Sequence, residues 1–216
     1  ALRFGVFAES VDDGATRLSS LFSPDPYEVS SNVEGMTKLD RLQLNFQLTK
    51  GLEKGELTAT TSYQDWDMNP NLTDLDLSFF DFGFSKVIQD EELWTQEFRF
   101  VTTPDDLATR FTAGLFFMDS TTNGDATREF PVPPGDFVPP GFVQTERTRF
   151  TIDQRNIAVY ANSDTSISDK TVLNFGIRYE ENQSSIYRTK DSSNNYNFPG
   201  PPEPVVDDSQ SETNGA

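Results

Sequence analysis

The chain has 216 residues and a formal net charge of −18, so it lacks the basic surface with which proteins bind nucleic-acid phosphates. It contains no cysteine and no histidine, which excludes disulfides, catalytic triads that use histidine and the usual zinc sites. Only 35% of the residues are hydrophobic, yet 19 are phenylalanine. That combination suggests apolar side chains placed at regular intervals along polar strands.

Seven strands are predicted, because apolar and polar side chains alternate with a period of two in seven stretches. The pattern is clear where Leu42, Leu44, Phe46 and Leu48 alternate with polar residues. In chain order the strands cover residues 2–8, two stretches within 41–66 on either side of a turn at 50–55, and residues 93–102, 109–119, 153–163 and 171–181.

The connections alternate between short and long. Residues 50–55, 103–106 and 166–169 have the Gly, Pro, Asp or Ser chemistry of tight turns. The other connections are long and polar, and they cover residues 10–39, 65–92, 119–153 and the tail from residue 182. Long loops are uncommon in compact domains, and their strict alternation with tight turns is typical of outer-membrane β-barrels.

The sequence therefore predicts an all-β fold, an antiparallel transmembrane β-barrel segment of about seven strands with short periplasmic turns and long extracellular loops. The apolar faces would contact lipid, with Gln96 and Arg155, which share these faces, near the rims. The same alternation also fits a soluble β-sandwich with its apolar face in the core. The barrel prediction places aromatic residues near strand ends at the membrane interfaces, namely Tyr63, Trp66, Trp94, Tyr160 and Tyr179.

Four motifs resemble those of TonB-dependent outer-membrane receptors. "TQEFRF" (95–100) is similar to the family's E-L-R-L strand, with Glu97 and Arg99 in the matching places, and "TPDDLATRFTAGLFF" (103–117) resembles the following turn and strand. "IAVYAN" (157–162) resembles the A-V-F-G strand, with Tyr160 in place of Phe. "LNFGIRYEEN" (173–182) resembles the G-x-R-Y-x-x-D strand end, with Glu181 at or near the acidic position. The order and spacing of the four motifs agree with the family.

This resemblance implies a barrel of about twenty-two strands, plugged by a separate domain and energised by the TonB complex of the inner membrane. Residues 1–216 would be a partial barrel domain, because plug and further strands are absent and seven strands cannot close such a barrel. The implied partners are outer-membrane lipid and lipopolysaccharide, the plug, the TonB complex and a small-molecule nutrient such as a ferric siderophore, haem, cobalamin or a carbohydrate. No cofactor is implied, and the implied location is the outer membrane of a Gram-negative bacterium.

Two groups of residues are candidates for a functional site. Glu97, Arg99, Arg178 and Glu180 are expected to face the lumen, where they would contact the plug or substrate, or form a solvated charge ladder that holds the strand register. In the predicted loops, aromatic residues are candidates for ligand contact, although they could equally pack within the loops; they are Phe79, Phe80, Phe82, Phe137 and Phe142.

No enzyme is predicted, because nothing in the sequence holds two carboxylates at a catalytic separation. Acidic residues of the 65–84 segment could supply oxygen ligands for Ca²⁺, but their spacing does not match an EF-hand, and no metal site is assigned. The predicted function is that of an outer-membrane receptor and transporter segment for energy-coupled nutrient uptake. The alternative is a soluble, secreted β-sandwich that serves as a binding or adhesion module.

Overall fold

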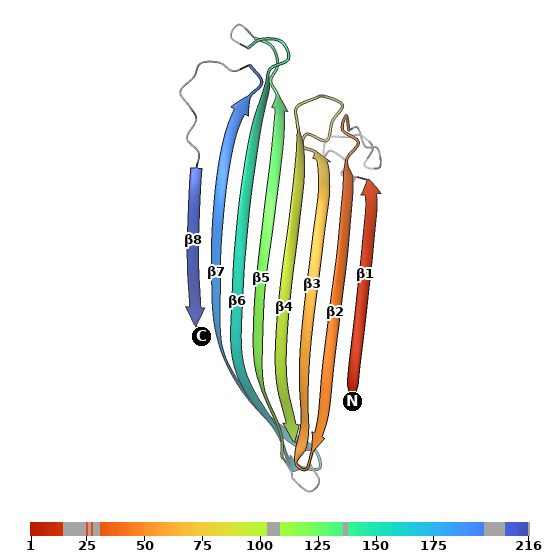
Figure 1. Ribbon diagram of the computed structural model, residues 1–216, viewed down its shortest axis with the longest axis vertical. Coiled ribbons are helices and arrows are strands. Elements are labelled where there is room, and N and C mark those ends of the chain that lie inside the picture. Colours follow the sequence, from red (N-terminus) through yellow and green to blue (C-terminus); the bar gives the residue numbers. More distant parts are fainter. Residues whose placement is uncertain are drawn as a thin grey trace.

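The computed structural model of the chain describes residues 1–14, 25, 27, 31–102, 109–135 and 138–196, together with the backbone of residues 206–215. These residues form one antiparallel sheet of eight strands, in which each strand pairs with its neighbours in the chain (Figure 1). The strands are β1 (Leu2–Gly14), β2 (Met36–Leu52), β3 (Gly55–Asp74), β4 (Phe84–Thr102), β5 (Thr109–Pro131), β6 (Val143–Ser168), β7 (Thr171–Asn194) and β8 (Val206–Gly215). Among the described residues there is no helix long and apolar enough to cross a membrane.

The seven predicted strands and their antiparallel arrangement are confirmed, and β8 adds an eighth strand within the predicted tail. Strands β2–β7 are much longer than the predicted stretches, and β6 has 26 residues. The predicted loops at 65–92 and 119–153 were therefore too long, since they reduce to residues 75–83 and 132–142. The upper part of β5, "TTNGDATRE", is polar on both faces, so the two-residue period that reveals a strand is absent there.

Two of the predicted tight turns are confirmed at the opposite end of the sheet. Only Glu53 and Lys54 separate β2 from β3, and only Asp169 and Lys170 separate β6 from β7. The third predicted turn, at residues 103–106, lies outside the described residues.

An apolar belt covers the lower part of one face of the sheet. The register aligns the apolar residues of neighbouring strands, so that Leu115 lies between Phe98 and Val159, and Val159 faces Tyr179. Because these side chains are not covered by other residues, Phe175 remains 66% exposed. The belt consists of Leu2, Phe4, Val6, Ala8, Leu42, Leu44, Phe46, Leu48, Leu57, Ala59, Tyr63, Trp94, Phe98, Phe100, Phe111, Ala113, Leu115, Phe117, Ile157, Val159, Ala161, Leu173, Phe175, Ile177 and Tyr179.

The upper boundary of the belt runs obliquely across the strands. On β2 the belt ends at Leu42, whereas on β7 it ends at Tyr179, which lies in register with Leu48 of β2. The boundary thus shifts by six residues, about 20 Å at about 3.3 Å per residue, over five strand spacings of about 4.8 Å each. This corresponds to a strand tilt of about 40° relative to the belt, which is within the range of membrane β-barrels.

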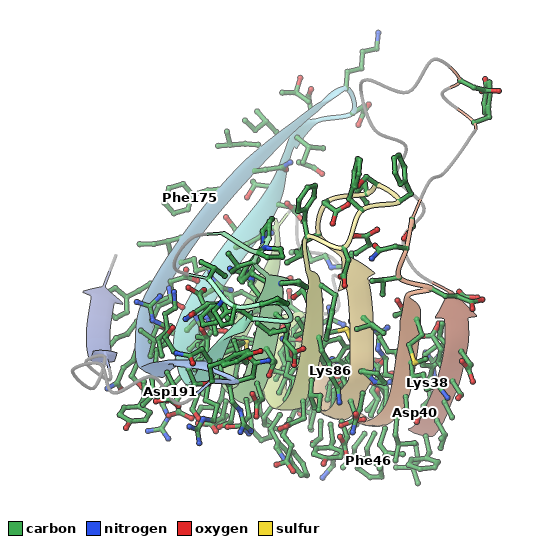
Figure 2. The ribbon with its side chains drawn as sticks, turned by 90° about the horizontal axis from the view of Figure 1, so that it is seen from above. Lys38, Asp40, Phe46, Lys86, Phe175 and Asp191 are labelled. Carbon is green, nitrogen blue, oxygen red and sulfur yellow. The ribbon has the colours of Figure 1, made fainter. Side chains whose placement is uncertain are left out.

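The two faces of the sheet differ in curvature. Figure 2 shows the sheet from above as an arc, with Phe46 and Phe175 on its convex side. The opposite, concave face is called the inner face here. Four buried strand side chains, Thr58, Ser120, Asn156 and Ala158, belong to the inner face, because side chains crowd together on the concave side of a bent sheet.

No second layer covers the apolar belt in the part of the chain that the structure describes, since all its strands belong to one sheet. The predicted alternative, a β-sandwich, requires two sheets packed face to face about 10 Å apart. The fold therefore does not support this alternative.

One polar residue of the belt face, Gln96, satisfies its amide within the sheet, since it accepts a hydrogen bond from the Thr61 hydroxyl and donates one to the Thr60 carbonyl over 3.0 Å.

Candidate functional site

The inner face carries a polar cluster centred on Tyr160 of β6. Its hydroxyl donates a hydrogen bond of 2.7 Å to Oε1 of Glu97 on β4, and thereby reaches across the intervening strand β5. The crossing is possible because residue 114 of β5 is glycine, where a Cβ would collide with the Tyr160 ring. Glycine is used where two groups must approach this closely. Tyr160 therefore ties three strands together.

Two predicted lumen-facing residues on β7 extend this cluster. Arg178 lies opposite Tyr160 in the β6–β7 register, and its Nε lies 2.6 Å from Oε2 of Glu180. Asn182 donates to the other carboxylate oxygen of Glu180 over 3.2 Å. Arg99 lies on β4 opposite Gly114. The structure thus places Glu97, Arg99, Arg178 and Glu180 together on the inner face.

Tyr160 and Trp66 lie on the inner face, so their prediction as membrane-interface residues was wrong. Trp66 pairs with Arg41 and Glu91, which are in the inner-face register, and Tyr160 contacts Glu97. By contrast, Tyr63 and Trp94 lie on the belt face at its upper boundary, where their ring centroids are 4.9 Å apart. The alternation of each strand, rather than aromatic character, determines which face an aromatic residue occupies.

The β3–β4 loop carries an exposed aromatic cluster. The ring centroids of Phe79 and Phe80 are 4.0 Å apart, and those of Phe80 and Phe82 are 5.5 Å apart. All three side chains are about half exposed or more. In Figure 2 this yellow loop lies over the concave side of the sheet, opposite Phe46. The structure therefore brings three of the five candidate loop residues together.

Asp76 organises this loop from its centre. One carboxylate oxygen accepts hydrogen bonds from the backbone and hydroxyl of Ser78, and the other accepts from the backbone N–H of Phe82 over 3.1 Å. Asn32 donates its backbone N–H to the Ser78 carbonyl over 3.0 Å. An aspartate that binds backbone groups two residues ahead stabilises a turn. In the part of the chain that the structure describes, no group of acidic residues is arranged to hold a metal ion.

The remaining candidate residues belong to the β5–β6 loop. Phe142 stacks on Tyr196, which follows β7, with ring centroids 6.1 Å apart, and the Tyr196 hydroxyl donates to the Pro140 carbonyl over 2.6 Å. Asn195 also donates to the Gly141 carbonyl over 2.7 Å. Phe137 lies outside the described residues. The β5–β6 loop is therefore attached to the end of β7, a contact that the sequence did not predict.

Above the belt, charged side chains cover the outer face of the strands. Arg155 lies one position above the belt on β6 and pairs with Asp119 at 3.1 Å. Higher up, a hydrogen bond from the Arg147 guanidinium lowers the pKa of Asp125. Partial burial, followed by the negative charges of Asp90, Asp40 and Asp65, raises the pKa of Asp67.

Several residues of these sites were missed by sequence reasoning. Tyr160 was assigned to the wrong environment. Ile157 and Val159 have odd numbers and Tyr160 has an even one, so the alternation along the strand would have placed Tyr160 on the other face from these apolar side chains. The role of Asp76 in its loop could have been predicted from the sequence D-L-S at residues 76–78, because an aspartate at this spacing is typical of a turn closed by a side chain. The contact of Phe142 with Tyr196 joins residues 54 positions apart and has no local signal.

Comparisons with known proteins identify the fold. No protein-family model matches the sequence, and no curated protein matches it by sequence. Among solved structures, the chain is similar to the ferric yersiniabactin uptake receptor FyuA from Yersinia pestis, with a TM-score of 0.70 and 12% sequence identity. The similarity covers 100% of this chain and 30% of that receptor. The sheet thus has the fold of an open segment of a β-barrel wall.

Proposed function

We propose that this chain forms part of the barrel wall of an outer-membrane receptor that imports a small-molecule nutrient. The observation that carries the proposal is the apolar belt, whose oblique boundary corresponds to a strand tilt of about 40°. When strands cross a flat membrane at a tilt, the apolar belt that contacts the lipid runs obliquely across them. A soluble sheet has no reason to confine apolar residues to an oblique band on an uncovered face.

The chemistry around the belt supports the same placement. Tyr63 and Trp94 lie at its upper boundary, and the next residues on that face are Asp65 and Glu92. Amphipathic aromatic rings are favourable at the membrane interface, and carboxylates are favourable only beyond it. The inner face is polar, which suits a barrel interior that holds water or protein.

The receptor role rests on the motif resemblance and on the similarity to the solved uptake receptor. In this proposal the end of the sheet with the two-residue turns faces the periplasm, and the aromatic loop at Phe79–Phe82 faces the outside. The inner-face cluster around Tyr160 would contact a plug domain, and the TonB complex would supply energy. The chain would bind and conduct its nutrient without catalysis.

The placement is tested by spin labels at two neighbouring positions of the full-length protein in outer membranes. The 216 residues contain no cysteine, so a cysteine introduced here adds a single label site within this segment. Phe98→Cys should be reached by oxygen, which concentrates in lipid, and not by a water-soluble nickel complex, whereas Glu97→Cys on the inner face should be reached by oxygen far less. One step along the strand exchanges the two faces.

The same experiment discriminates against a water-soluble protein. If both labels respond to the nickel complex and neither to oxygen, the belt does not meet lipid and the proposal fails. Folding of the protein in plain buffer, without detergent or lipid, would contradict it as well.

Uptake is tested separately by deleting the gene for the full-length protein. Growth should fall when one nutrient, supplied in turn as iron complex, haem, cobalamin or carbohydrate, is made limiting. The intact gene should restore growth. Growth that is unaffected under every limitation would overturn the transport role while leaving the membrane placement intact.

A further inference from the structure

Above the Tyr160 cluster, large apolar side chains gather on the inner face. They occupy three neighbouring rows of the register, which run from β1 to β7 and pass through Trp66, Met68 and Asn71 of β3. The apolar side chains of these rows are called the inner band here. Its six largest members, all of them partly exposed, are Leu39, Trp66, Met68, Phe150, Ile152 and Ile186.

A glycine lets the inner band continue across the middle of the sheet. Phe150 of β6 lies opposite Gly124 of β5, where a Cβ would collide with the Phe150 ring. The ring therefore lies over β5 and covers part of the distance to Met68, which occupies the same row on β3. Glycine permits this close approach, as it does for Tyr160 over Gly114. Phe150, however, presents a ring without a polar atom.

The inner band lies on the loop side of the apolar belt. Trp66 follows Tyr63, the uppermost belt residue of β3, by three residues, and Phe150 precedes Ile157, the uppermost belt residue of β6, by seven. At about 3.3 Å per residue and a tilt of about 40°, Trp66 and Phe150 lie about 8 Å and about 18 Å beyond the hydrocarbon.

The aromatic loop Phe79–Phe82 adds a second apolar surface at the same end of the sheet. It lies over the concave side in Figure 2, which is the side that carries the inner band. A molecule that enters the barrel from this end meets both apolar surfaces before it reaches the Tyr160 cluster.

The charges around the inner band balance, unlike those of the whole chain, which has a net charge of −18. On β1–β7 its three rows contain three acidic and three basic residues, and the row above adds Arg128 and Glu146. Two ion pairs are formed here, since Arg41 lies 3.5 Å from Glu9 and Lys190 lies 3.0 Å from Glu146. The charged residues of the three rows are Glu9, Asp13, Glu91, Arg41, Arg188 and Lys190.

A largely apolar molecule without net charge fits this surface best. Contact with the inner band would remove apolar area of both partners from water, which is favourable in proportion to that area. A carbohydrate would place hydroxyl groups against side chains that cannot form hydrogen bonds with them. A strongly anionic or cationic iron complex would meet as many like charges as opposite ones.

We propose that the inner band is a binding surface for the imported nutrient, and that this nutrient is a small molecule with a largely apolar surface and no net charge. The inference rests on the proposed uptake function and narrows its substrate class. Carbohydrates and strongly charged iron complexes are excluded by it, whereas an iron complex enclosed by an apolar, neutral ligand is not.

Photolabelling of the full-length protein in outer-membrane vesicles tests this inference, with benzophenone as the probe. Benzophenone is neutral and largely apolar, and on irradiation it forms covalent bonds to nearby C–H groups. It also dissolves in lipid, so the belt provides an internal reference. Labelling of peptides that contain Trp66, Met68, Phe150 or Ile152 should saturate with concentration, whereas labelling of belt peptides should rise in proportion to it.

Ile152→Gln should raise the half-saturating concentration about tenfold, because it replaces an apolar side chain of the inner band by a polar one of similar size. Ile88→Gln is the matched control, since Ile88 is also partly exposed and lies above the belt, but on the outer face. It should stay within about twofold of the wild type. Equal effects of the two variants would overturn the inference.

The wild type by itself tests the charge of the nutrient. Neutral 4-methylbenzophenone should suppress labelling of the inner band at least about tenfold more effectively than the anion 4-benzoylbenzoate or the cation 4-benzoylbenzyl-trimethylammonium. If either ion competes as well as the neutral compound, the proposed substrate class is wrong.

Failure of this inference differs from failure of the proposed function. A labelled belt with an unlabelled or non-saturable inner band would mean that another part of the protein covers the band, and it would overturn the inference while leaving the membrane placement intact. The Phe98→Cys spin label and growth of the gene deletion report the placement and the uptake independently of the inner band.

Discussion

Tyr160 shows how one residue can couple strands that are distant in the chain. Its ring lies over Gly114 and its hydroxyl binds Glu97, so β4, β5 and β6 are held in one register on the inner face. A one-residue slip between these strands would remove the contact and also turn the apolar side chains of the slipped strand to the wrong face. The contact therefore stabilises the register as well as the fold.

Tyr160→Phe should lower the free energy of unfolding by about 1–3 kcal/mol, because the variant loses a hydrogen bond to a carboxylate and leaves Glu97 without this donor. The measurement is urea unfolding of the full-length protein refolded into lipid vesicles. Tyr179→Phe, which removes the same atom from the belt face, should change the free energy by less than about 0.5 kcal/mol. Equal effects of the two variants would contradict the role assigned to Tyr160.

Two aspartates of the outer face should respond to pH with opposite signs. The pKa of Asp125 lies below its ordinary value of 3.8, so its contribution to stability is complete above that value and is lost as the pH falls through the lowered pKa. The pKa of Asp67 is raised, so its favourable contribution exists below 3.8 and is lost as the pH rises through the raised pKa.

Asp125→Asn should therefore destabilise the protein at pH 7, and Asp67→Asn should stabilise it at the same pH. The difference for Asp67→Asn should shrink toward zero at about pH 3, below the ordinary pKa of 3.8, whereas the difference for Asp125→Asn should shrink only as the pH falls through the lowered pKa of Asp125. Urea unfolding at the two pH values measures the effect, and Asp169→Asn in the β6–β7 turn serves as the control. A shift of the same sign for both outer-face variants would show that the local charges do not act as described.

At the level of elements, each long strand consists of two chemically different halves. The lower half alternates apolar and polar residues, whereas the upper half is mostly polar, lacks this alternation and is held by the backbone ladder and by side-chain pairs such as Arg147 with Asp125 and Lys190 with Glu146. Cross-strand pairs of opposite charge stabilise a sheet modestly. The upper half can therefore extend far beyond the belt without burying an apolar core.

The β3–β4 loop depends on Asp76. Asp76→Ala should release the backbone N–H groups of Ser78 and Phe82, and the loop should then open more often. Chymotrypsin, which cleaves after phenylalanine, should cut within Phe79–Phe82 several-fold faster than in the wild type.

Asp81→Ala is the matched control for this loop, because the one contact described for the Asp81 carboxylate is a long one of 3.4 Å from the Asn32 amide. It should leave the cleavage rate nearly unchanged. If Asp76→Ala is cut no faster than Asp81→Ala, the loop is organised by other contacts.

For the whole molecule, the belt decides whether the sheet is compatible with water or with lipid. Leu115 lies near its centre and is 57% exposed. With the proposed membrane placement, Leu115→Arg should make folding into bilayers less favourable by about 2–4 kcal/mol, because the arginine would have to be placed in hydrocarbon.

Thr127→Arg is the control for this prediction, since Thr127 is on the same face of the same strand but above the belt. Its effect should be below about 0.5 kcal/mol. Folding into vesicles, followed by urea titration, measures both variants. A similar cost at both positions would mean that depth in the membrane is not what distinguishes them.

The sequence by itself determined the strands, their antiparallel order and the face that each apolar residue occupies. It could do so because the two-residue period is a local property of the chain, as in Leu42–Leu48 and Leu173–Tyr179. The period disappears where the strands are mostly polar and their few apolar residues do not alternate, so the upper halves of β3–β7 and all of β8 were interpreted as loops. The same alternation predicted that Glu97 and Arg178 lie on the face opposite the apolar residues.

Only the tertiary structure decided which of these residues meet. The contact of Tyr160 with Glu97 and the stacking of Phe142 on Tyr196 each join residues from strands or loops far apart in the sequence. They depend on the register between neighbouring strands, which is the sum of many backbone pairings and leaves no trace in any single stretch. The tilt of the belt belongs to the same class, because it emerges only when the ends of the apolar runs are compared across the aligned sheet.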